Sequence, residues 1–267
     1  MKKYRKTLAL LLAMTLMFSL SACSLRGNDT FSIVAQLDTR QLSLAYRTGD
    51  RAGEQIVAAL SQLQADEDIS DISRYWFRDD LITLKGTKNA LEELEAELVP
   101  RTLIVGYDKG HLPYSGHDSE GLPIGFHIDL ARAVGAALGW RVEFLPIDTA
   151  SAEIELKSGN VDCVFGVHTN FANAKDMALS PPYMRTTIII ASLNGSGLIS
   201  EKSLAGKALA VSEYGQFFDC LTGKPELMEK PEYIIRLPGS SDDCLRALKD
   251  GACDAVVTDT AAIEYFR

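Results

Sequence analysis

Residues 156–164 read LKSGNVDCV, and residues 248–256 read LKDGACDAV. The two stretches share the pattern Leu-Lys-x-Gly-x-x-Asp-x-Val. In each, a lysine near the end of a predicted helix suits the negative end of the helix dipole, and the glycine suits the left-handed residue that ends many helices. An apolar run typical of a buried strand comes next. Two copies of this junction predict two similar βαβ lobes.

Outward from these junctions, strand-like runs alternate with helix-like stretches from residue 101 onward. The spacing of apolar residues predicts helices over 125–138 and 242–248, and a further helix from about residue 216. This alternation is typical of the α/β class with parallel sheets. The predicted strands cover residues 103–106, 141–145, 162–167, 186–191, 208–211, 233–237 and 255–257.

The N-terminal third has a different pattern. We expect a strand at 42–46, helices at 53–64 and 69–77, and a loop at 78–86. An amphipathic stretch at 87–99 predicts a further helix, which Pro100 would end. On its own this third has too few strands to bury a sheet.

The chain begins with the layout of a secretory signal peptide. A basic start, an apolar run at 8–20 and small residues precede Cys23. This ending resembles the lipobox of bacterial lipoproteins, which implies removal of residues 1–22 and lipidation of Cys23; an uncleaved anchor helix is the alternative. Either way we expect the body at the extracytoplasmic face of the cell membrane, joined to it by a polar tether at 23–30.

Composition and charge limit the possible partners. The 267 residues are 46% hydrophobic and carry a formal net charge of −9, which excludes a mainly disordered chain and disfavours binding to nucleic acid. Loss of residues 1–22 removes four basic side chains and no acidic ones, so the net charge falls to −13. We therefore expect the acyl chains, rather than charge, to hold the protein at the lipid bilayer.

Four cysteines follow the tether. Cys163 and Cys253 lie in apolar, strand-like runs, where we expect buried free thiols. Cys220 and Cys244 occupy predicted helical positions, and exported proteins can form disulfides. The sequence leaves open whether these two pair.

A series of short motifs runs through residues 102–266. As a set they resemble the polar amino-acid branch of the bacterial extracellular solute-binding proteins, the substrate-binding lipoproteins of ABC transporters. The resemblance implies an α/β, two-lobe, type II periplasmic-binding-protein fold with a ligand cleft between the lobes. The motifs are GYD at 106–108, GLPIGFHIDL at 121–130, GNVD at 159–162, SPPY at 180–183, LAGK at 204–207 and DAVVTD at 254–259.

The family pattern is not complete at the C-terminus, and its missing pieces resemble residues 31–77. We therefore expect a solute-binding domain at 31–267 that is circularly permuted, with residues 78–100 joining the old ends. Lobe 1 would cover about 43–190, and lobe 2 about 192–267 plus 29–40. A domain-swapped dimer is the alternative.

The resemblance also implies how a zwitterion would bind in the cleft. Asp259 matches the acid that meets the amine, and it could also cap the helix that follows. Thr169 matches the hydroxyl on the carboxylate side, but Asn173 or Ala174 stands where the family has arginine, and the nearby Lys175 and Arg185 are off the family position. The other expected ligand-binding residues are His111, Tyr114, Gly215 and Gln216. His127 is expected to be structural, whereas His168 could reach the cleft. Glu213 and Tyr214 would favour a cationic or aromatic ligand if they face the cleft.

These observations predict a lipid-anchored binding protein that captures a small amine-bearing solute, such as an amino acid or derivative, by lobe closure for an ABC permease. A sensory lipoprotein and a periplasmic-type dehydratase on the same fold are the alternatives. We expect no catalytic residue, cofactor or metal, because the four histidines lack metal-ligand spacing and no nucleophile motif occurs.

Overall fold

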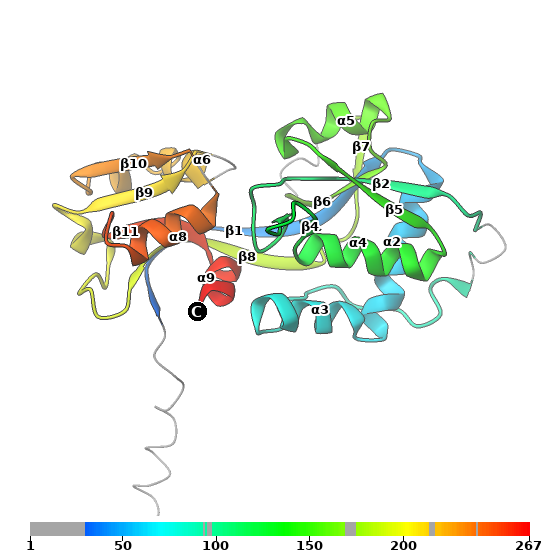
Figure 1. Cartoon of the computed structure of the whole chain (residues 1–267), viewed down its shortest axis with the longest axis horizontal. Coiled ribbons are helices and arrows are strands. Elements are labelled where there is room, and N and C mark those ends of the chain that lie inside the picture. Colours follow the sequence, from blue (N-terminus) through cyan, green and yellow to red (C-terminus); the bar gives the residue numbers. More distant parts are fainter. Residues whose placement is uncertain (1–29, 93, 95–97, 169–174, 214–216, 239) are drawn as a thin grey trace, which may run out of the picture. The chain divides into compact units, whose positions relative to one another are not determined.

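Two long antiparallel strands, β1 (Phe31–Arg47) and β8 (Met184–Leu193), form the centre of the fold (Figure 1). They pair from Phe31 opposite Leu193 to Leu42 opposite Met184. The computed structural model describes residues 30–92, 94, 98–168, 175–213, 217–238 and 240–267. Cys23 and the signal-peptide prediction lie outside these residues.

The β1–β8 pair lies between two sets of three parallel strands. One set is β2 (Thr102–Tyr107), β5 (Arg141–Pro146) and β6 (Cys163–His168), which joins β1 through β6. The other is β9 (Ala208–Ser212), β10 (Tyr233–Leu237) and β11 (Ala255–Asp259), which joins β8 through β11. The resulting order, β10-β9-β11-β8-β1-β6-β2-β5, confirms the predicted α/β class with two similar strand sets. Three short strands complete the described sheets: β3 (Gly116–His117), β4 (Pro123–Ile124) and β7 (Met177–Leu179).

Helices from the N-terminal third and from the middle of the chain cover the β2–β5–β6 set. Helices α2 (Arg51–Ala65) and α3 (Asp68–Phe77) pack with α4 (Phe126–Leu138) around a core that includes Ile56, Leu60 and Leu130. A further helix, α5 (Ala152–Ser158), packs with residues such as Val164 in a separate cluster. The N-terminal third therefore buries its apolar helix faces against the strands and helices that follow it in the chain.

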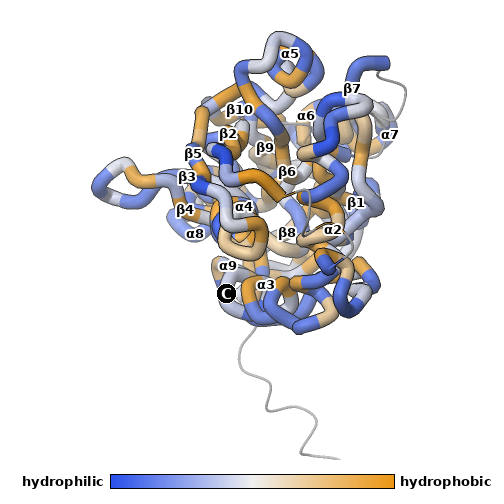
Figure 2. The backbone as a smooth tube through the Cα atoms, turned by 90° about the vertical axis from the view of Figure 1, so that its right-hand side faces the viewer, coloured by the Kyte–Doolittle hydropathy of each residue, from blue (hydrophilic) through white to orange (hydrophobic). Residues whose placement is uncertain are grey.

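The β9–β10–β11 set has an apolar cluster on each face. Helices α6 (Phe217–Thr222) and α7 (Pro225–Met228) pack in one, and α8 (Ser241–Lys249) and α9 (Thr260–Phe266) in the other. Cys220 packs in the first cluster and Cys244 lies in the second, so these two do not pair. All four described cysteines are free thiols. Hydrophobic segments gather in the interior strands, and hydrophilic segments lie on the outer connections (Figure 2).

The two repeated sequence stretches perform the same structural task. Asp162 accepts a hydrogen bond from the Ile104 amide at 2.8 Å and pairs with Arg101 at 2.7 Å. Asp254 accepts a hydrogen bond from the Ala208 amide at 2.9 Å and pairs with Lys207 at 3.2 Å. In each set an aspartate at the start of one strand therefore fixes the start of its parallel neighbour. The preceding glycines, Gly159 and Gly251, have φ values of 78° and 74°, as the left-handed position requires.

The structure corrects two expectations for the N-terminal third. The strand expected at 42–46 is the end of a much longer strand that begins at Phe31, because β1 pairs with β8 along most of its length. Of residues 87–99, the described residues 88–91 form a turn, 92 and 94 have 3-10 geometry, and none of the described residues is α-helical. Asn89 is left-handed there, with φ 60°, a conformation that interrupts a right-handed helix.

None of the helices among the described residues is both long enough and apolar enough to cross a membrane.

Candidate functional site

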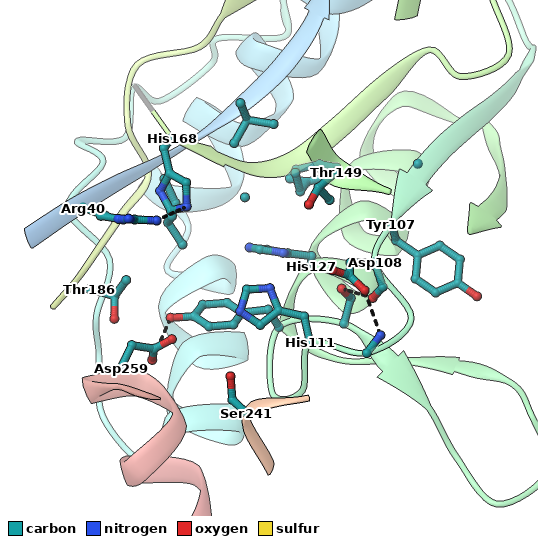
Figure 3. A pocket seen from close by; sticks show the side chains of 18 of the residues that line it. Arg40, Tyr107, Asp108, His111, His127, Thr149, His168, Thr186, Ser241 and Asp259 are labelled. Atoms are coloured by element: carbon teal, nitrogen blue, oxygen red, sulfur yellow. Dashed lines mark hydrogen bonds between the residues drawn. The ribbon is translucent and has the colours of Figure 1, made fainter. Parts of the chain in front are cut away.

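A cavity lies against the β1–β8 pair, between the two parallel strand sets (Figure 3). Its wall draws on strands of both sets and on the loop after β2. In both sets the wall includes the carboxyl ends of parallel strands, where α/β sheets ordinarily bind ligands. The lining residues are Arg40, Leu42, Val105, Gly106, Tyr107, Asp108, Gly110, His111, Tyr114, Ser115, His127, Ile128, Thr149, Phe165, Gly166, Val167, His168, Thr186, Ile188, Phe217, Ser241 and Asp259.

Asp259 is the most buried carboxylate of the cavity wall, with 3% of its surface exposed. It ends the buried strand β11 and caps α9, and its Oδ1 accepts hydrogen bonds from the Ala262 amide at 2.9 Å and the Tyr114 hydroxyl at 3.1 Å. Burial raises the pKa of Asp259, whereas these two hydrogen bonds and His111 oppose the rise. Asp259 therefore both caps a helix and lines the cavity.

His111 and Tyr114 form the part of the wall that faces Asp259. They lie in the loop after β2, with ring centroids 5.0 Å apart. Burial and the neighbouring Asp259 raise the pKa of Tyr114 well above 10, so its hydroxyl stays protonated and donates to the carboxylate. The His111 Nε2 atom is buried and has no hydrogen-bond partner among the described residues. It can therefore bond to a ligand.

His127 belongs to a buried network at the start of α4. The Tyr183 hydroxyl accepts the Gly166 amide at 2.7 Å and contacts His127 Nε2 at 2.9 Å. Burial lowers the pKa of His127 to about 3, so the imidazole is neutral at pH 7. Gly166 has φ +80°, and a Cβ there would lie 2.4 Å from His127 Cε1, so the close approach requires glycine. His127 is structural, as expected, and it also forms part of the cavity wall.

The cavity wall also contains charged side chains that sequence reasoning did not select. Asp108 lies at the carboxyl end of β2, and its Oδ1 accepts the Gly110 amide at 2.9 Å. Arg40 projects from the middle of β1, and its Nη1 lies 3.3 Å from His168 Nε2. In Figure 3 Arg40, Thr186 and Asp259 lie at one end of the group and Asp108 at the other. The position of Asp108 at a strand end could have indicated its role, whereas Arg40 depends on the pairing of β1 with β8.

The structure brings together three of the predicted ligand-binding residues, Asp259, His111 and Tyr114. His168 also reaches the cavity. Glu213 does not line it; it is exposed and lies 3.9 Å from Arg236. Lys175 and Arg185 are likewise exposed and outside the cavity wall. The remaining predictions, Thr169, Asn173, Tyr214, Gly215 and Gln216, lie outside the described residues.

The wall suits a small polar solute better than a metal ion. No group of three or more His, Cys, Asp or Glu side chains in the described part of the chain is placed to hold a metal. Among the described residues of the wall, the formal charges come from one arginine and two aspartates. With both carboxylates ionised, a ligand that carries a net positive charge balances these groups.

Comparisons with known proteins agree with this geometry. Residues 103–235 match the family model of bacterial extracellular solute-binding proteins, family 3. The chain is 29% identical over 171 residues to the arginine-binding extracellular protein ArtP of Bacillus subtilis, covering 62% of this chain and 65% of the relative. It is 25% identical to a probable amino-acid ABC transporter-binding protein of Haemophilus influenzae, covering 62% and 63%. The chain thus spans slightly less than two thirds of the length of both relatives.

Solved structures show the same fold. An ancestral cationic amino acid solute-binding protein is 28% identical, with a TM-score of 0.54 over 67% of this chain and 76% of the other. A substrate-binding protein of an ABC uptake transporter from Streptococcus pneumoniae, solved with bound histidine, is 23% identical, with a TM-score of 0.52 over 66% and 71%. The structural relatives are type II periplasmic binding proteins, so the predicted fold class is confirmed.

Proposed function

Residues 103–235 of this chain belong to the bacterial extracellular solute-binding proteins of family 3, and we infer that the whole chain is the amino-acid-binding component of an ABC transporter. The observation that carries this proposal is Asp259, a carboxylate buried in a cavity between two strand sets. A desolvated ammonium group needs an anion and hydrogen-bond acceptors. Asp259 meets that need because Tyr114 and Ala262 hold its Oδ1 in place.

We propose further that the amino acid has a cationic side chain. Asp108 supplies a second carboxylate, at the end of the cavity away from Asp259 (Figure 3). A ligand that placed its α-amino group at Asp259 and a second cation near Asp108 would have charge partners at both ends. The similarity to an arginine-binding protein and to an ancestral cationic amino acid-binding protein supports this ligand class.

The mechanism that we propose is closure of the two strand sets around the ligand. β1 and β8 link the sets, and β1 has register shifts at Ile33/Ala35 and Gln36/Asp38. Such irregularities bend strands locally, which suits a hinge. Closure would add the contacts of β11 and α6 to those of the β2–β5–β6 set and so raise affinity.

A thermal-shift screen of the whole chain without residues 1–22 tests the function. We expect L-arginine, L-lysine or L-histidine at 100 times the dissociation constant to stabilise the protein by about 2.7 kcal/mol, which raises the melting temperature by roughly 5–10 °C. L-glutamate and succinate should give no shift. If none of the amino acids shifts the transition, the proposal is wrong, and a compound that is consumed during the assay would favour the dehydratase alternative.

The variant Asp108→Asn tests the cationic side chain separately. We expect it to weaken the binding of L-arginine or L-lysine by about 10-fold or more, because the variant removes one charge partner. The ratio of their affinities to that of L-glutamine should therefore fall. Isothermal titration calorimetry measures both effects. An unchanged preference would remove the cationic side chain from the proposal and leave amino-acid binding intact.

We also propose that the domain is circularly permuted and lipid-anchored at Cys23. The central position of β1, and the packing of α2 and α3 on α4, support the permutation. A monomeric mass in solution would support it, whereas a dimer that dissociates only on unfolding would favour a domain swap.

For the anchor, Cys23→Ser should release the protein from the membrane fraction; retention of the unlipidated variant would favour an uncleaved helix.

A further inference from the structure

The end of the cavity that contains Asp259 has a second charged side chain whose use is unassigned, and this side chain projects from the central strand β1 (Figure 3). Arg40 projects from β1 into the cavity wall, and 11% of its side chain is exposed. Among the described residues of that wall it is the sole lysine or arginine. Its Nε donates to Asp38 Oδ2 at 3.1 Å and its Nη1 to His168 Nε2 at 3.3 Å, and these contacts fix the plane of the guanidinium.

His168 provides a further donor beside Arg40. A guanidinium can only donate hydrogen bonds, so His168 Nε2 must accept from Arg40, and a neutral imidazole then carries its proton on Nδ1. That Nδ1 atom is buried and has no hydrogen-bond partner in the described part of the chain. Burial, with Arg40 as the next cause, lowers the pKa of His168 to about 3, which agrees with the neutral form. Arg40 and His168 together form a group of hydrogen-bond donors at the Asp259 end of the cavity.

The strand register places Arg40 close to Asp259. Arg40 lies opposite Thr186 on β8, and Asp259 lies opposite Ile188, two residues further along the same strand. All four line the cavity and therefore share one face of the sheet. At ordinary strand spacing the Cα atoms of Arg40 and Asp259 are about 12 Å apart, a distance that the two side chains and one amino-acid head group can span.

We propose that Arg40, supported by His168, binds the carboxylate of the ligand whose amine binds Asp259. Arg40 thus takes the task of an arginine that the segment 169–176 lacks in its sequence. The ligand class is an α-amino acid with both head-group charges, rather than a simple amine. This inference rests on the proposed function, because it assigns a residue of the same cavity.

The position on β1 has a consequence for binding. Arg40 belongs to a strand that pairs with β6 on one side and β8 on the other, so it is fixed to the centre of the sheet rather than to one strand set. The carboxylate contact can therefore form before the two sets close. Planar guanidinium groups suit carboxylates because two parallel N–H donors can meet two oxygens.

The test compares amino acids with their decarboxylated forms. Isothermal titration calorimetry on the whole chain without residues 1–22 would use L-arginine against agmatine, L-lysine against cadaverine and L-histidine against histamine. For the wild-type protein we expect the amino acid to bind at least about 100-fold more tightly than its amine. In Arg40→Gln we expect the affinity for the amino acid to fall by about 30-fold or more. The ratio of the affinity for the amino acid to that for its amine, the acid-to-amine ratio, should then be below about 5.

Two further variants control the result. Arg40→Lys keeps the charge without the planar fork and should restore part of the lost affinity. Arg185→Gln removes an arginine that lies next to Thr186 on β8 but is exposed and outside the cavity wall, so it should retain the wild-type ratio. The melting temperature of each unliganded variant verifies that it is folded.

The outcomes separate this inference from the proposed function. If amino acids bind the wild-type protein and Arg40→Gln keeps the full acid-to-amine ratio, the assignment of Arg40 is wrong and the proposed function stands. The same conclusion follows if Arg185→Gln loses the ratio and Arg40→Gln does not. If no compound of the panel binds the wild-type protein, both the function and the assignment of Arg40 are wrong.

Discussion

Asp259→Asn is expected to weaken binding of the cationic amino acid by about 30- to 4,000-fold, the range for removing one partner of a buried, hydrogen-bonded charge pair. The ligand ammonium would lose its anion but remain desolvated in the cavity. Asparagine occupies nearly the same volume, so the change isolates the charge from the shape. Calorimetric titration measures the dissociation constant.

The fold should survive this substitution. Asparagine is among the preferred helix N-caps, and its Oδ1 can still accept from the Ala262 amide and the Tyr114 hydroxyl. Burial raises the pKa of Asp259 above 3.8, so its contribution to folding stability is fully present below that value and is lost as the pH rises through the raised native value. We therefore expect the unliganded Asn variant to melt at or above the wild-type temperature at pH 7.5, although the same ligand concentration stabilises it less than the wild type.

Asp254→Asn provides the matched control for Asp259→Asn. Asp254 precedes β11, which Asp259 ends, and it contacts Lys207 and the Ala208 amide outside the cavity wall. We expect its affinity for ligand to match the wild type, with a small loss of stability from its partly exposed ion pair. Unchanged affinity in Asp259→Asn would remove Asp259 from the binding site and with it the observation on which the proposed function rests.

The sequence predicted the parts of the fold that depend on local pattern. The repeated Leu-Lys-x-Gly-x-x-Asp-x-Val stretches predicted two similar lobes, and the structure shows the same aspartate-to-amide contact at both. Asp259 could be selected because an acid at the end of an apolar strand is unusual and has a defined place in the resembling family. The apolar periodicity of 125–138 likewise predicted α4 within one residue.

The remaining features depend on contacts between distant segments. β1 is continuous because β8 pairs with it, and the polar residues near its middle, such as Arg40, break the apolar pattern by which strands are predicted. Arg40 and His168 are 128 residues apart in the chain, so the sequence alone could not bring them together. The helix predicted over 87–99 is not formed at its start, where residues 88–91 form a turn and Asn89 adopts the left-handed conformation that the apolar spacing of the sequence does not reveal.

The protein is expected to lose stability steeply when the pH falls below about 6.5, because two buried histidines must remain neutral in the folded state. The pKa values of His127 and His168 are lowered from 6.5 to about 3, in both cases mainly by burial. His111 lowers both further, and Arg40 lowers that of His168, whereas Asp38 acts in the opposite direction on His168. Between these pH values the unfolded chain binds protons that the folded protein excludes, so unfolding becomes more favourable as the pH falls.

The size of this effect makes it measurable. Well below pH 6.5 each histidine contributes about 1.4 kcal/mol per pH unit, and the slope is half of this at pH 6.5 itself, so the free energy of unfolding should fall by roughly 3 kcal/mol between pH 6.5 and pH 5. Asp259 opposes part of the loss because its raised pKa has the opposite sign. Urea denaturation without ligand at pH 7.5, 6.5, 5.5 and 5.0 measures the slope, and Asp259→Asn should make it steeper or leave it unchanged.

Single variants test whether the two histidines cause the slope of the free energy of unfolding against pH. His168→Gln should remove about half of it, and His127→Gln about half as well, although the second variant lowers stability at pH 7.5 because it leaves the Tyr183 hydroxyl without its imidazole partner. His168→Gln therefore decides the question if His127→Gln does not fold. A free energy of unfolding that stays constant between pH 7 and pH 5, or a slope unchanged in His168→Gln, would show that these imidazoles are accessible to protons in the folded protein. In that case the burial of these two imidazoles in the cavity wall would also be wrong, because burial is the main cause of both lowered pKa values.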